Sequence, residues 1–337
     1  MIKFSVCLVL QLQSYLSHPF NLCKLFKTVL FYAEAYFLNT EIKLQSVMNI
    51  HICAAGIIKE TIMAKYKTMH YAIAMLMLVY IIPFTGIAQA NVEGVINAEK
   101  SFAAYALQHN SRDAFMQFLD SANGIEFRNG EAKRSYDIWS VRKADSSRLI
   151  WQPAFAGIAK SGELGFTTGP WEYKKSANSP VIASGEYSTI WHLNDKGEWK
   201  YLVDIGTGFN TSAYAVSNIK TWSGTYSDIA ADDPLTVDRK FIQQYAALHN
   251  DAYKNIIATD AWFIIDGSQP LQGAQSILAG LGTLPANVQF METGGGISAS
   301  GDLVYVYGTA RHEDKLTNYM RVWQKTKDGY KILLQVM

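Results

Sequence analysis

The sequence predicts an α+β fold made of two tandem copies of one unit, and three features of the chain predict it. The stretch "YALQHN" at 105–110 returns almost unchanged as "YAALHN" at 245–250. In each copy a helical pattern comes first and alternating strands follow, unlike the strand–helix alternation of a parallel sheet. An Asp-Lys-Gly turn in one copy and a Lys-Asp-Gly turn in the other separate aromatic-rich strands, the pattern of a β-hairpin.

Each copy opens with an amphipathic helix. Phe102 and Tyr105 fall at helical spacing in the first copy, and the second copy repeats the pattern from Ile242. The helix is predicted to end at His-Asn in both, because histidine suits a helix C-terminus and asparagine tolerates a left-handed cap. Ser111 or Asp251 can then cap a second helix.

A short strand, a third helix and a run of strands complete each copy. The third helix is predicted at 131–144 in the first copy and at 271–281 in the second. The segment 207–233 is rich in Ser, Thr, Gly and Ala and is predicted to be a linker. The strands match pairwise between the copies, 161–173 with 300–312 and 186–206 with 318–337.

Residues 63–90 have the three parts of a secretory signal peptide. Lys65 and Lys67 form a positive start, an apolar segment runs from 71 to 82, and Ala-Gln-Ala ends the stretch at 88–90. The apolar segment is shorter than the ~20 residues that span a membrane comfortably. We therefore expect a cleaved signal and a periplasmic or secreted protein, with an uncleaved N-terminal anchor as the alternative.

Residues 1–62 precede this signal, although a signal peptide normally begins at the start of a chain. We expect an over-extended translation start, with Met63 or Met69 as the true one; the alternative is an additional membrane-associated segment. All three cysteines lie before residue 91, so the mature part contains none. Its stability must therefore come from packed cores rather than from disulfides.

The charge and the motifs of residues 91–337 exclude several classes of function. Seven basic and three acidic residues precede this part, which leaves 23 basic and 26 acidic residues and a net charge of −3. A mildly acidic chain without a basic run argues against a nucleic-acid partner. No Walker-type loop, no G-x-S-x-G and no paired-histidine zinc motif occurs, and the four histidines are scattered. We expect no metal and no cofactor.

With "SGELGFTTGPWEY" at 161–173 and a terminal hairpin behind three helices, the chain resembles the nuclear transport factor 2-like superfamily, in its SnoaL-like branch. The resemblance covers nearly all of 92–337. It implies two cones, at 91–206 and 234–337, each a curved and mostly antiparallel sheet wrapped around three helices, with a ligand pocket at the mouth. Members commonly pair through the outer sheet face, so the chain is expected to form an intrachain pseudo-dimer that needs no further oligomer.

Strand alternation adds an expectation about this pairing. Tyr187 and Trp191 share one face of their strand, and Tyr319 and Trp323 take the matching face in the second copy. Aromatic rings on both faces of a sheet suggest that its outer face is covered too. We expect these four rings to be buried where the two sheets meet.

The resemblance also implies candidate catalytic residues. Ketosteroid-isomerase-like members use an aspartate base together with a tyrosine and a strand acid that donate to the oxyanion. In the second copy these positions fall on Asp266, Tyr245 and Asn318, the last of which is not an acid. In the first copy Tyr105 and Glu186 take the tyrosine and strand-acid positions, but "FRNG" supplies no base.

Because neither copy has a full catalytic set, the sequence predicts an exported protein that binds a small apolar or carbonyl-containing molecule. Trp151 and Trp171 make the first pocket the more aromatic one, and His192 is a further candidate for its lining. An isomerase, cyclase or dehydratase with Asp266 as its base is the alternative. A structural pseudo-dimer whose pockets are filled by side chains is the third possibility. Since Asp-Gly is typical of an exposed turn, we expect Asp266→Asn to leave ligand binding nearly unchanged.

We predict that export removes the chain up to Ala90, because small residues at 88 and 90 satisfy the signal peptidase. N-terminal sequencing of protein recovered from the cell envelope measures the cleavage point, and Asn91 is the expected first residue. A mature protein that begins upstream of Met63 would contradict both the cleavage site and the over-extended start.

Overall fold

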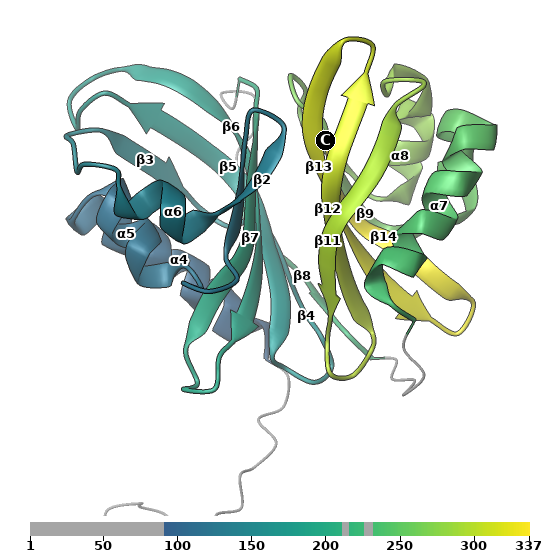
Figure 1. Ribbon diagram of the computed structural model, residues 1–337, viewed down its shortest axis with the longest axis horizontal. Coiled ribbons are helices and arrows are strands. Elements are labelled where there is room, and N and C mark those ends of the chain that lie inside the picture. Colours follow the sequence, from purple (N-terminus) through teal and green to yellow (C-terminus); the bar gives the residue numbers. More distant parts are fainter. Residues whose placement is uncertain (1–90, 211–215, 226–231) are drawn as a thin grey trace, which may run out of the picture. The chain divides into compact units, whose positions relative to one another are not determined.

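The two halves of the described chain each place helices against one face of a curved sheet (Figure 1). The computed structural model describes residues 91–210, 216–225 and 232–337. The expectations for residues 1–62 and for the signal at 63–90 therefore concern residues outside the described part. All described residues belong to one compact unit.

The first cone begins with two helices that asparagines cap. In α4 (Val92–Gln108), the side chain of Asn91 accepts a hydrogen bond from the backbone of Glu93 at 3.0 Å. The cap of α5 (Ser111–Phe118) is Asn110 rather than the expected Ser111. Its Oδ1 accepts from the backbone of Asp113 at 2.9 Å, because the extended backbone of Asn110 places its side chain over the first turn.

The sheet of the first cone starts earlier than the sequence predicts. The first residues of the predicted helix at 131–144 form a strand instead, because they pair antiparallel with β1, and the helix is confined to α6. The strand order is β2-β1-β7-β6-β5-β4-β8, and β3 also pairs with β5. The elements are β1 (Ile125–Arg128), β2 (Glu131–Arg134), α6 (Ser135–Ser140), β3 (Arg148–Trp151), β4 (Phe155–Ile158), β5 (Leu164–Lys174), β6 (Val181–Leu193), β7 (Trp199–Gly208) and β8 (Lys220–Ser223).

Part of the segment expected as a linker, 207–233, belongs to this sheet. Strand β7 continues to Gly208, and β8 pairs in parallel with β4. The low hydrophobicity of the segment concealed β8, whose four residues are all at least partly exposed on the edge of the sheet.

The second cone has the same order of helices and strands as the first, with fewer strands in its sheet. Asp251 does not cap an α-helix, because the backbone of His249 turns left-handed (φ 49°) and the chain continues as a 3-10 helix. The strand order is β10-β9-β14-β13-β12-β11. The elements are α7 (Pro234–Leu248), η3 (His249–Asn255), β9 (Ile257–Ile264), β10 (Leu271–Gln272), α8 (Ala274–Gly280), η4 (Leu281–Thr283), β11 (Gln289–Ile297), β12 (Leu303–His312), β13 (Lys315–Thr326) and β14 (Gly329–Val336).

The repeated Ser-Gly-acid turns of the two copies bind each other. The backbone N–H of Ser161 donates to Ser300 Oγ at 3.0 Å, and the backbone N–H of Ser300 donates to Ser161 Oγ at 3.1 Å. The neighbouring bonds are reciprocal as well: Lys160 N–H donates to Asp302 and Ala299 N–H donates to Glu163. Contacts that repeat when the two partners are exchanged are the mark of a two-fold interface, so the cones meet as a pseudo-dimer.

The four rings expected between the sheets are buried, but on the other face. Their relative exposures are 7% for Tyr187, 0% for Trp191 and Tyr319, and 2% for Trp323. Each of the two tryptophans donates to an acid on the first helix of its own cone, at 3.0 Å in the first cone and 3.1 Å in the second. The rings therefore pack toward the helices. Alternation identifies which residues share a face, but it does not say which face the helices cover.

Other aromatic rings lie between the two cones. Phe155 stacks on Trp262 with ring centroids 5.4 Å apart, and Phe127 meets the edge of Tyr307 at 5.7 Å. Tyr305 and Tyr307 share their face with Val322 and Met320, the strand partners that face away from the helix side. One continuous apolar core consequently runs from the outer face of the first sheet into the second cone.

The sequence repeat "YALQHN"/"YAALHN" has a spacing of 140 residues, one more than the spacing of structurally equivalent residues in the two cones. Phe102 and Phe241 are 139 positions apart and contact the buried strand tryptophan of their own cones at 6.1 and 5.8 Å. Tyr105 and Tyr245, 140 positions apart, have different surroundings: Tyr105 is partly exposed, whereas Tyr245 is 3% exposed. The similar letters thus overstate the likeness of the two tyrosines.

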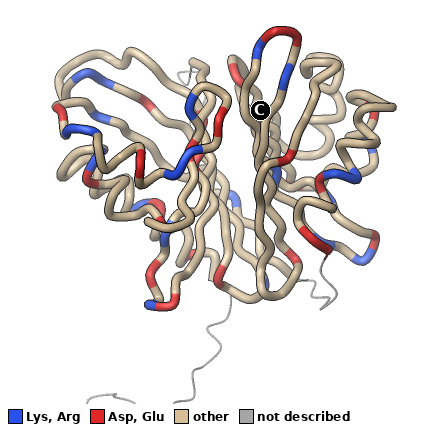
Figure 2. The backbone as a smooth tube through the Cα atoms, viewed as in Figure 1, with Lys and Arg blue, Asp and Glu red and all other residues tan. Residues whose placement is uncertain are grey.

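Acidic and basic residues are interspersed along the described backbone (Figure 2). Within the described ranges, no helix is both long enough and apolar enough to cross a membrane.

Glu186 is a buried carboxyl on the outer face of β6. It is adjacent to Tyr187 in the strand, and neighbouring residues of a strand point to opposite faces. Glu186 therefore points away from the face that carries Tyr187, and its strand partners are Pro170 and Thr207. The side chain is 0% exposed; the Thr168 hydroxyl lies 3.3 Å from Oε1, and Oε2 has no hydrogen-bond partner among the described residues. Burial raises the pKa of Glu186 to about 8, against a small opposing effect of Thr168.

We predict that Glu186→Gln flattens the pH dependence of stability. Folded Glu186 keeps its proton up to a pKa of about 8, whereas the unfolded side chain loses it near 4.5. The stability it contributes is therefore present below pH 4.5 and declines as the pH rises toward 8. Urea unfolding of the wild type should show a steeper loss between pH 5 and 9 than the variant, by about 2 kcal/mol or more. Exposed Glu131→Gln is the matched control and should follow the wild type; equal slopes for Glu186→Gln and the wild type would refute the prediction.

Candidate functional site

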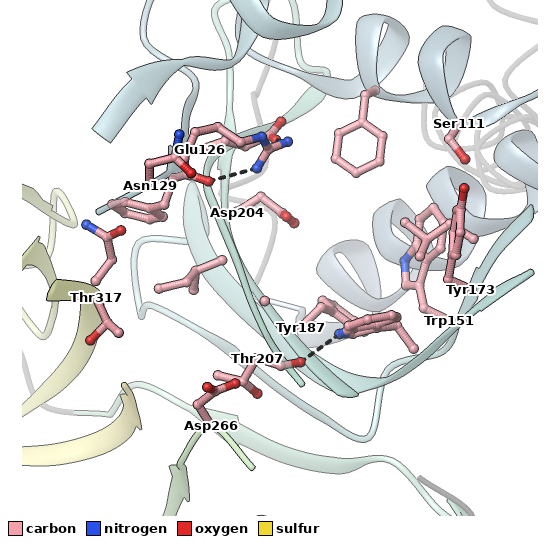
Figure 3. Close-up of a pocket in the computed structure, with 18 of the residues that line it drawn as sticks. Ser111, Glu126, Asn129, Trp151, Tyr173, Tyr187, Asp204, Thr207, Asp266 and Thr317 are labelled. Atoms are coloured by element: carbon pink, nitrogen blue, oxygen red, sulfur yellow. Dashed lines mark hydrogen bonds and ion pairs between the residues drawn. The ribbon is translucent and has the colours of Figure 1, made fainter. Parts of the chain in front are cut away.

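The first cone encloses a cavity of about 520 Å³ between its helices and the concave face of its sheet (Figure 3). The second cone supplies part of the rim through Asp266, Met337 and the start of β13 at 315–318. Six of the aromatic residues that line the cavity form an aromatic wall: Phe102, Phe115, Trp139, Trp151, Trp171 and Tyr187.

The aromatic wall is fixed by contacts among its own members. Phe115 stacks on Trp139 with ring centroids 4.0 Å apart, and Phe102 meets Trp151 edge-on at 4.8 Å. The tryptophan N–H groups are used within the protein: Trp171 donates to the carbonyl of Thr207 at 3.1 Å, and Trp139 and Trp151 donate to buried glutamates. With their polar atoms satisfied, the rings offer the cavity an apolar surface.

Two carboxyl groups of the wall lie side by side on neighbouring strands. Strand β1 pairs in parallel with β7, and Glu126 is the direct partner of Asp204. Glu126 accepts from Arg128 at 2.7 Å, from Tyr201 at 2.9 Å and from Trp139. One oxygen of Asp204 accepts from the Thr189 hydroxyl at 2.8 Å. Asp204 lies amid the drawn lining residues, pointing into the cavity (Figure 3).

A β-bulge brings Asp204 to the concave face. The register of β6 and β7 shifts between Ile190 and Trp191, whose partners are Val203 and Tyr201. Leu202 is therefore the extra residue, and Tyr201 and Asp204, three positions apart, face the same side. Without the bulge, simple alternation would place one of them on the outer face.

Burial and the neighbouring carboxyl determine which of the two acids holds a proton. Burial, and next the charge of Glu126, raise the pKa of Asp204 to about 8. Burial also raises the pKa of Glu126, but the charge of Arg128 and three donated hydrogen bonds oppose the rise. Asp204 therefore carries the proton at neutral pH and can both donate and accept a hydrogen bond inside the cavity.

Tyr187 lies in the wall on the same face of β6 as Thr189, the strand partner of Asp204. Tyr187 is 7% exposed and lines the cavity, and its hydroxyl has no hydrogen-bond partner among the described residues. Burial, and next the charges of Glu99 and Glu186, raise its pKa well above the usual tyrosine range, so the hydroxyl keeps its proton. Tyr187 therefore contributes its ring to the cavity, whereas its hydroxyl oxygen is buried in the protein.

Four of the residues proposed from the sequence line this cavity. Trp151 and Trp171 belong to the aromatic wall, whereas Asp266 and Asn318 reach the rim from the second cone. Asp266 accepts from the backbone of Gly208 at 2.9 Å and pairs with Lys315 at 3.2 Å, with 49% of its side chain exposed. This exposed turn setting is the one that Asp-Gly suggested.

The other four proposed residues do not line the cavity. Tyr245, the expected oxyanion donor, gives its hydroxyl proton to Asn250 at 3.1 Å or to Pro285 at 3.3 Å within the second cone. It does not meet Asp266 and Asn318 in one site. Tyr105 stacks on His109 instead, Glu186 is buried on the outer face, and His192 binds Asp120 at 2.8 Å.

The residues with the clearest chemistry were missed in the sequence. Asp204 stands within the apolar run "YLVDIG", and Glu126 within the short strand "GIEFR". An acid inside a strand of apolar residues is itself a signal, because a charge is seldom buried without a reason. The pairing of β1 with β7, which makes these two acids neighbours, is a contact between segments far apart in the sequence.

The corresponding interior of the second cone is filled by an arginine. Arg321 is 0% exposed, and its Nη1 lies 3.0 and 2.9 Å from the two oxygens of Asp238. Its Nε donates to Gln335 at 2.6 Å. The hydroxyl of Tyr319 and the indole of Trp323 also donate to Asp238, which satisfies the buried carboxylate.

Strand register identifies which residues of the two cones correspond. Thr189 faces Asp204 across β6 and β7, as Arg321 faces Gln335 across β13 and β14. Glu126 is likewise the β1 partner of Asp204, and the β9 partner of Gln335 is Phe263. The acid pair of the first cone is therefore replaced by phenylalanine and glutamine in the second.

No group of three or more His, Cys, Asp or Glu that could hold a metal ion occurs within the residues that the structure describes. The cavity lining instead includes the acids Glu126 and Asp204 and the rim residues Arg128, Arg142, Lys315 and Asp266.

No protein-family profile and no curated protein matches the chain. Similar solved structures include an NTF2-like protein of unknown function from Shewanella oneidensis MR-1, with 16% identity over 34% of this chain and 96% of that one, and a TM-score of 0.28. A ketosteroid isomerase-like protein from Erwinia carotovora atroseptica has 10% identity over 31% and 90%, with a TM-score of 0.26. Nuclear transport factor 2 from Cryptosporidium parvum has 17% identity over 33% and 97%, with a TM-score of 0.27. These likenesses concern the fold of one cone.

We predict that Asp238→Ala strongly destabilises the protein, because it leaves the buried charge of Arg321 unpaired. The expected loss in the free energy of unfolding is about 3–5 kcal/mol. The double variant Asp238→Leu with Arg321→Met removes both charges and should lose less than Asp238→Ala alone. Asp232→Ala, which breaks the exposed pair with Lys240, is the control and should cost below about 1 kcal/mol. Urea unfolding measures all four proteins, and a small loss for Asp238→Ala would contradict the prediction.

Proposed function

We propose that this chain is an exported protein that binds one small, largely apolar molecule, and that the first cone holds it. The observation that carries the proposal is the cavity of about 520 Å³ with its aromatic wall. Ligand sites are typically concave, mainly apolar and supplied with a few polar groups that fix orientation. Here Asp204 supplies such a group.

The second cone supports the site without duplicating it. Its interior is occupied by Arg321, which is fully buried, so the two cones differ where a ligand would lie. It also contributes the rim residues Asp266, Lys315 and Asn318 to the first cone's cavity. A single chain thus supplies both parts of the proposed site, which requires no cofactor and no second copy.

Export is part of the proposal and rests on the signal-like stretch at 63–90. A periplasmic or secreted binding protein without cysteine in its mature part needs no disulfide formation after export.

We expect Gly206→Leu to weaken ligand binding, because the leucine side chain would occupy part of the cavity. Gly206 lines the cavity, and a Cβ there would meet its nearest atom, Nε1 of Trp171, at 3.7 Å, so a side chain fits without backbone strain. Calorimetric titration with 2-(2-naphthyl)ethanol should show at least a tenfold weaker dissociation constant, roughly the effect of losing 1.4 kcal/mol. Gly282→Leu, where an added Cβ meets nothing within 4 Å, is the control. Unchanged binding in a folded Gly206→Leu protein would exclude the first cone as the site.

Proton transfer at a carbonyl compound is the second candidate function, and the Glu126–Asp204 pair favours it. A carboxyl whose pKa lies at about 8 is close to the working pH of a general acid or base. An assay of 5-ene-3-ketosteroid isomerisation tests the idea. If it is right, Asp204→Asn lowers the rate by about 10²–10⁴-fold, while exposed Asp195→Asn leaves it unchanged. Absence of turnover by the wild type on this and related enolisable ketones would reject it.

A further inference from the structure

The second cone holds a cation, the guanidinium of Arg321, in the interior that corresponds to the cavity of the first cone. The guanidinium carbon of Arg321 lies 4.5 Å from the centroid of Phe241, 4.1 Å from Phe290 and 4.3 Å from Tyr319. Nη1 binds an acid of the first helix and Nε binds the side chain of Gln335, whereas Nη2 has no partner among the described residues. The cation is thus surrounded by aromatic rings and by acceptor oxygens. Ring faces and carboxylates both stabilise a positive charge.

The first cone has corresponding surroundings without the cation. Tyr187 and Phe102 correspond to Tyr319 and Phe241, and Asp204 stands where Gln335 accepts from the guanidinium. Thr189 takes the place of Arg321, and its short side chain does not reach across the interior. Phe102, Tyr187 and Asp204 all line the cavity, so the cavity lies beside the position that corresponds to the guanidinium of the second cone.

We propose that the ligand of the first cone carries a protonated nitrogen, as an amine or amidine on a flat apolar body, and that this nitrogen binds Asp204. The proposal rests on the proposed function, since it names the ligand class of the same cavity. One oxygen of Asp204 accepts from Thr189, and its other oxygen has no partner among the described residues. The aromatic wall would enclose the apolar body and present ring faces to the nitrogen.

The basic residues of the cavity do not oppose a cationic ligand at this position. Arg128 is paired with Glu126, and Lys315 is paired with Asp266, with 44% and 69% of their side chains exposed. Arg142 is exposed and lies over the Trp139 ring, 4.9 Å from its centroid. Charges that are paired or in water act weakly at a distance, whereas the carboxyl of Asp204 would touch the ligand.

Binding of a cation should displace the proton of Asp204. In the free protein, burial and the charges of Glu126 and Glu99 keep the carboxyl protonated, against the effects of Thr189 and Arg128. A ligand nitrogen would supply the positive charge that the first cone lacks and would favour the carboxylate. An amine that is already protonated at pH 7 would then release close to one proton on binding, since the pKa of the free carboxyl lies at about 8.

Three probes with the same naphthalene body test the proposal: 2-(2-naphthyl)ethylamine, 2-(2-naphthyl)ethanol and 2-naphthylacetate. Calorimetric titration of the mature protein at pH 7, in buffers with different ionisation enthalpies, gives each dissociation constant and the number of protons released. We expect the amine to bind at least about tenfold more tightly than the alcohol and to release close to one proton. The alcohol should release none, and the acetate should bind most weakly.

Asp204→Asn, which keeps the size of the side chain, identifies the group responsible. In the variant the amine should bind no more tightly than the alcohol, and the released proton should disappear. Asp195→Asn, in the exposed turn between β6 and β7, is the matched control and should leave both unchanged. A thermal melt of each variant verifies that it is folded.

The results separate the two levels of the proposal. Equal affinities for amine and alcohol, or tightest binding of the acetate, overturn the cationic ligand and leave the apolar site in place. An amine preference that survives Asp204→Asn also overturns it, because another group would then bind the nitrogen. If none of the three probes binds, the proposed function itself fails, and the cationic ligand fails with it.

Discussion

Each cone depends on one buried acid of its first helix that receives hydrogen bonds from the sheet. Glu99 accepts from Trp191 at 3.0 Å and also from Trp151 and Thr167, and it is 0% exposed. Asp238 does the same for Trp323 and Tyr319 in the second cone. A buried carboxyl without partners would be costly, so these bonds fix the helix against the concave face of the sheet. The remaining interior of each cone is arranged around this contact.

The two acids are satisfied in different ways, and the interiors of the two cones differ accordingly. Asp238 is paired with Arg321, whose side chain lies between helix and sheet. Glu99 has only neutral donors, and burial raises its pKa despite them. In the first cone the indole of Trp151, not a cation, reaches the acid of the helix, and a cavity lies beside it. The two interiors therefore differ although their elements correspond.

The interface between the cones adds to the site as well as to stability. The reciprocal bonds of Ser161 and Ser300 fix the relation of the two sheets, and the rings of Phe155 and Trp262 continue the core between them. The same association brings Asp266 and the start of β13 to the rim of the first cavity. A single cone of this kind would lack that rim, so the pairing is part of the cavity's geometry.

The sequence by itself determined the α+β class, the two copies and the aromatic character of the first pocket, because periodicity and repeated turns are local properties. It also determined that Tyr187 and Trp191 share one face and that Asp266 belongs to an exposed turn. Only the tertiary structure decided that this face meets the helices, that Tyr245 lies apart from Asp266, and that Glu126 and Asp204 form a pair. These facts depend on the parallel pairing of β1 with β7, which joins segments more than 70 residues apart, and on a bulge that no alternation pattern reveals.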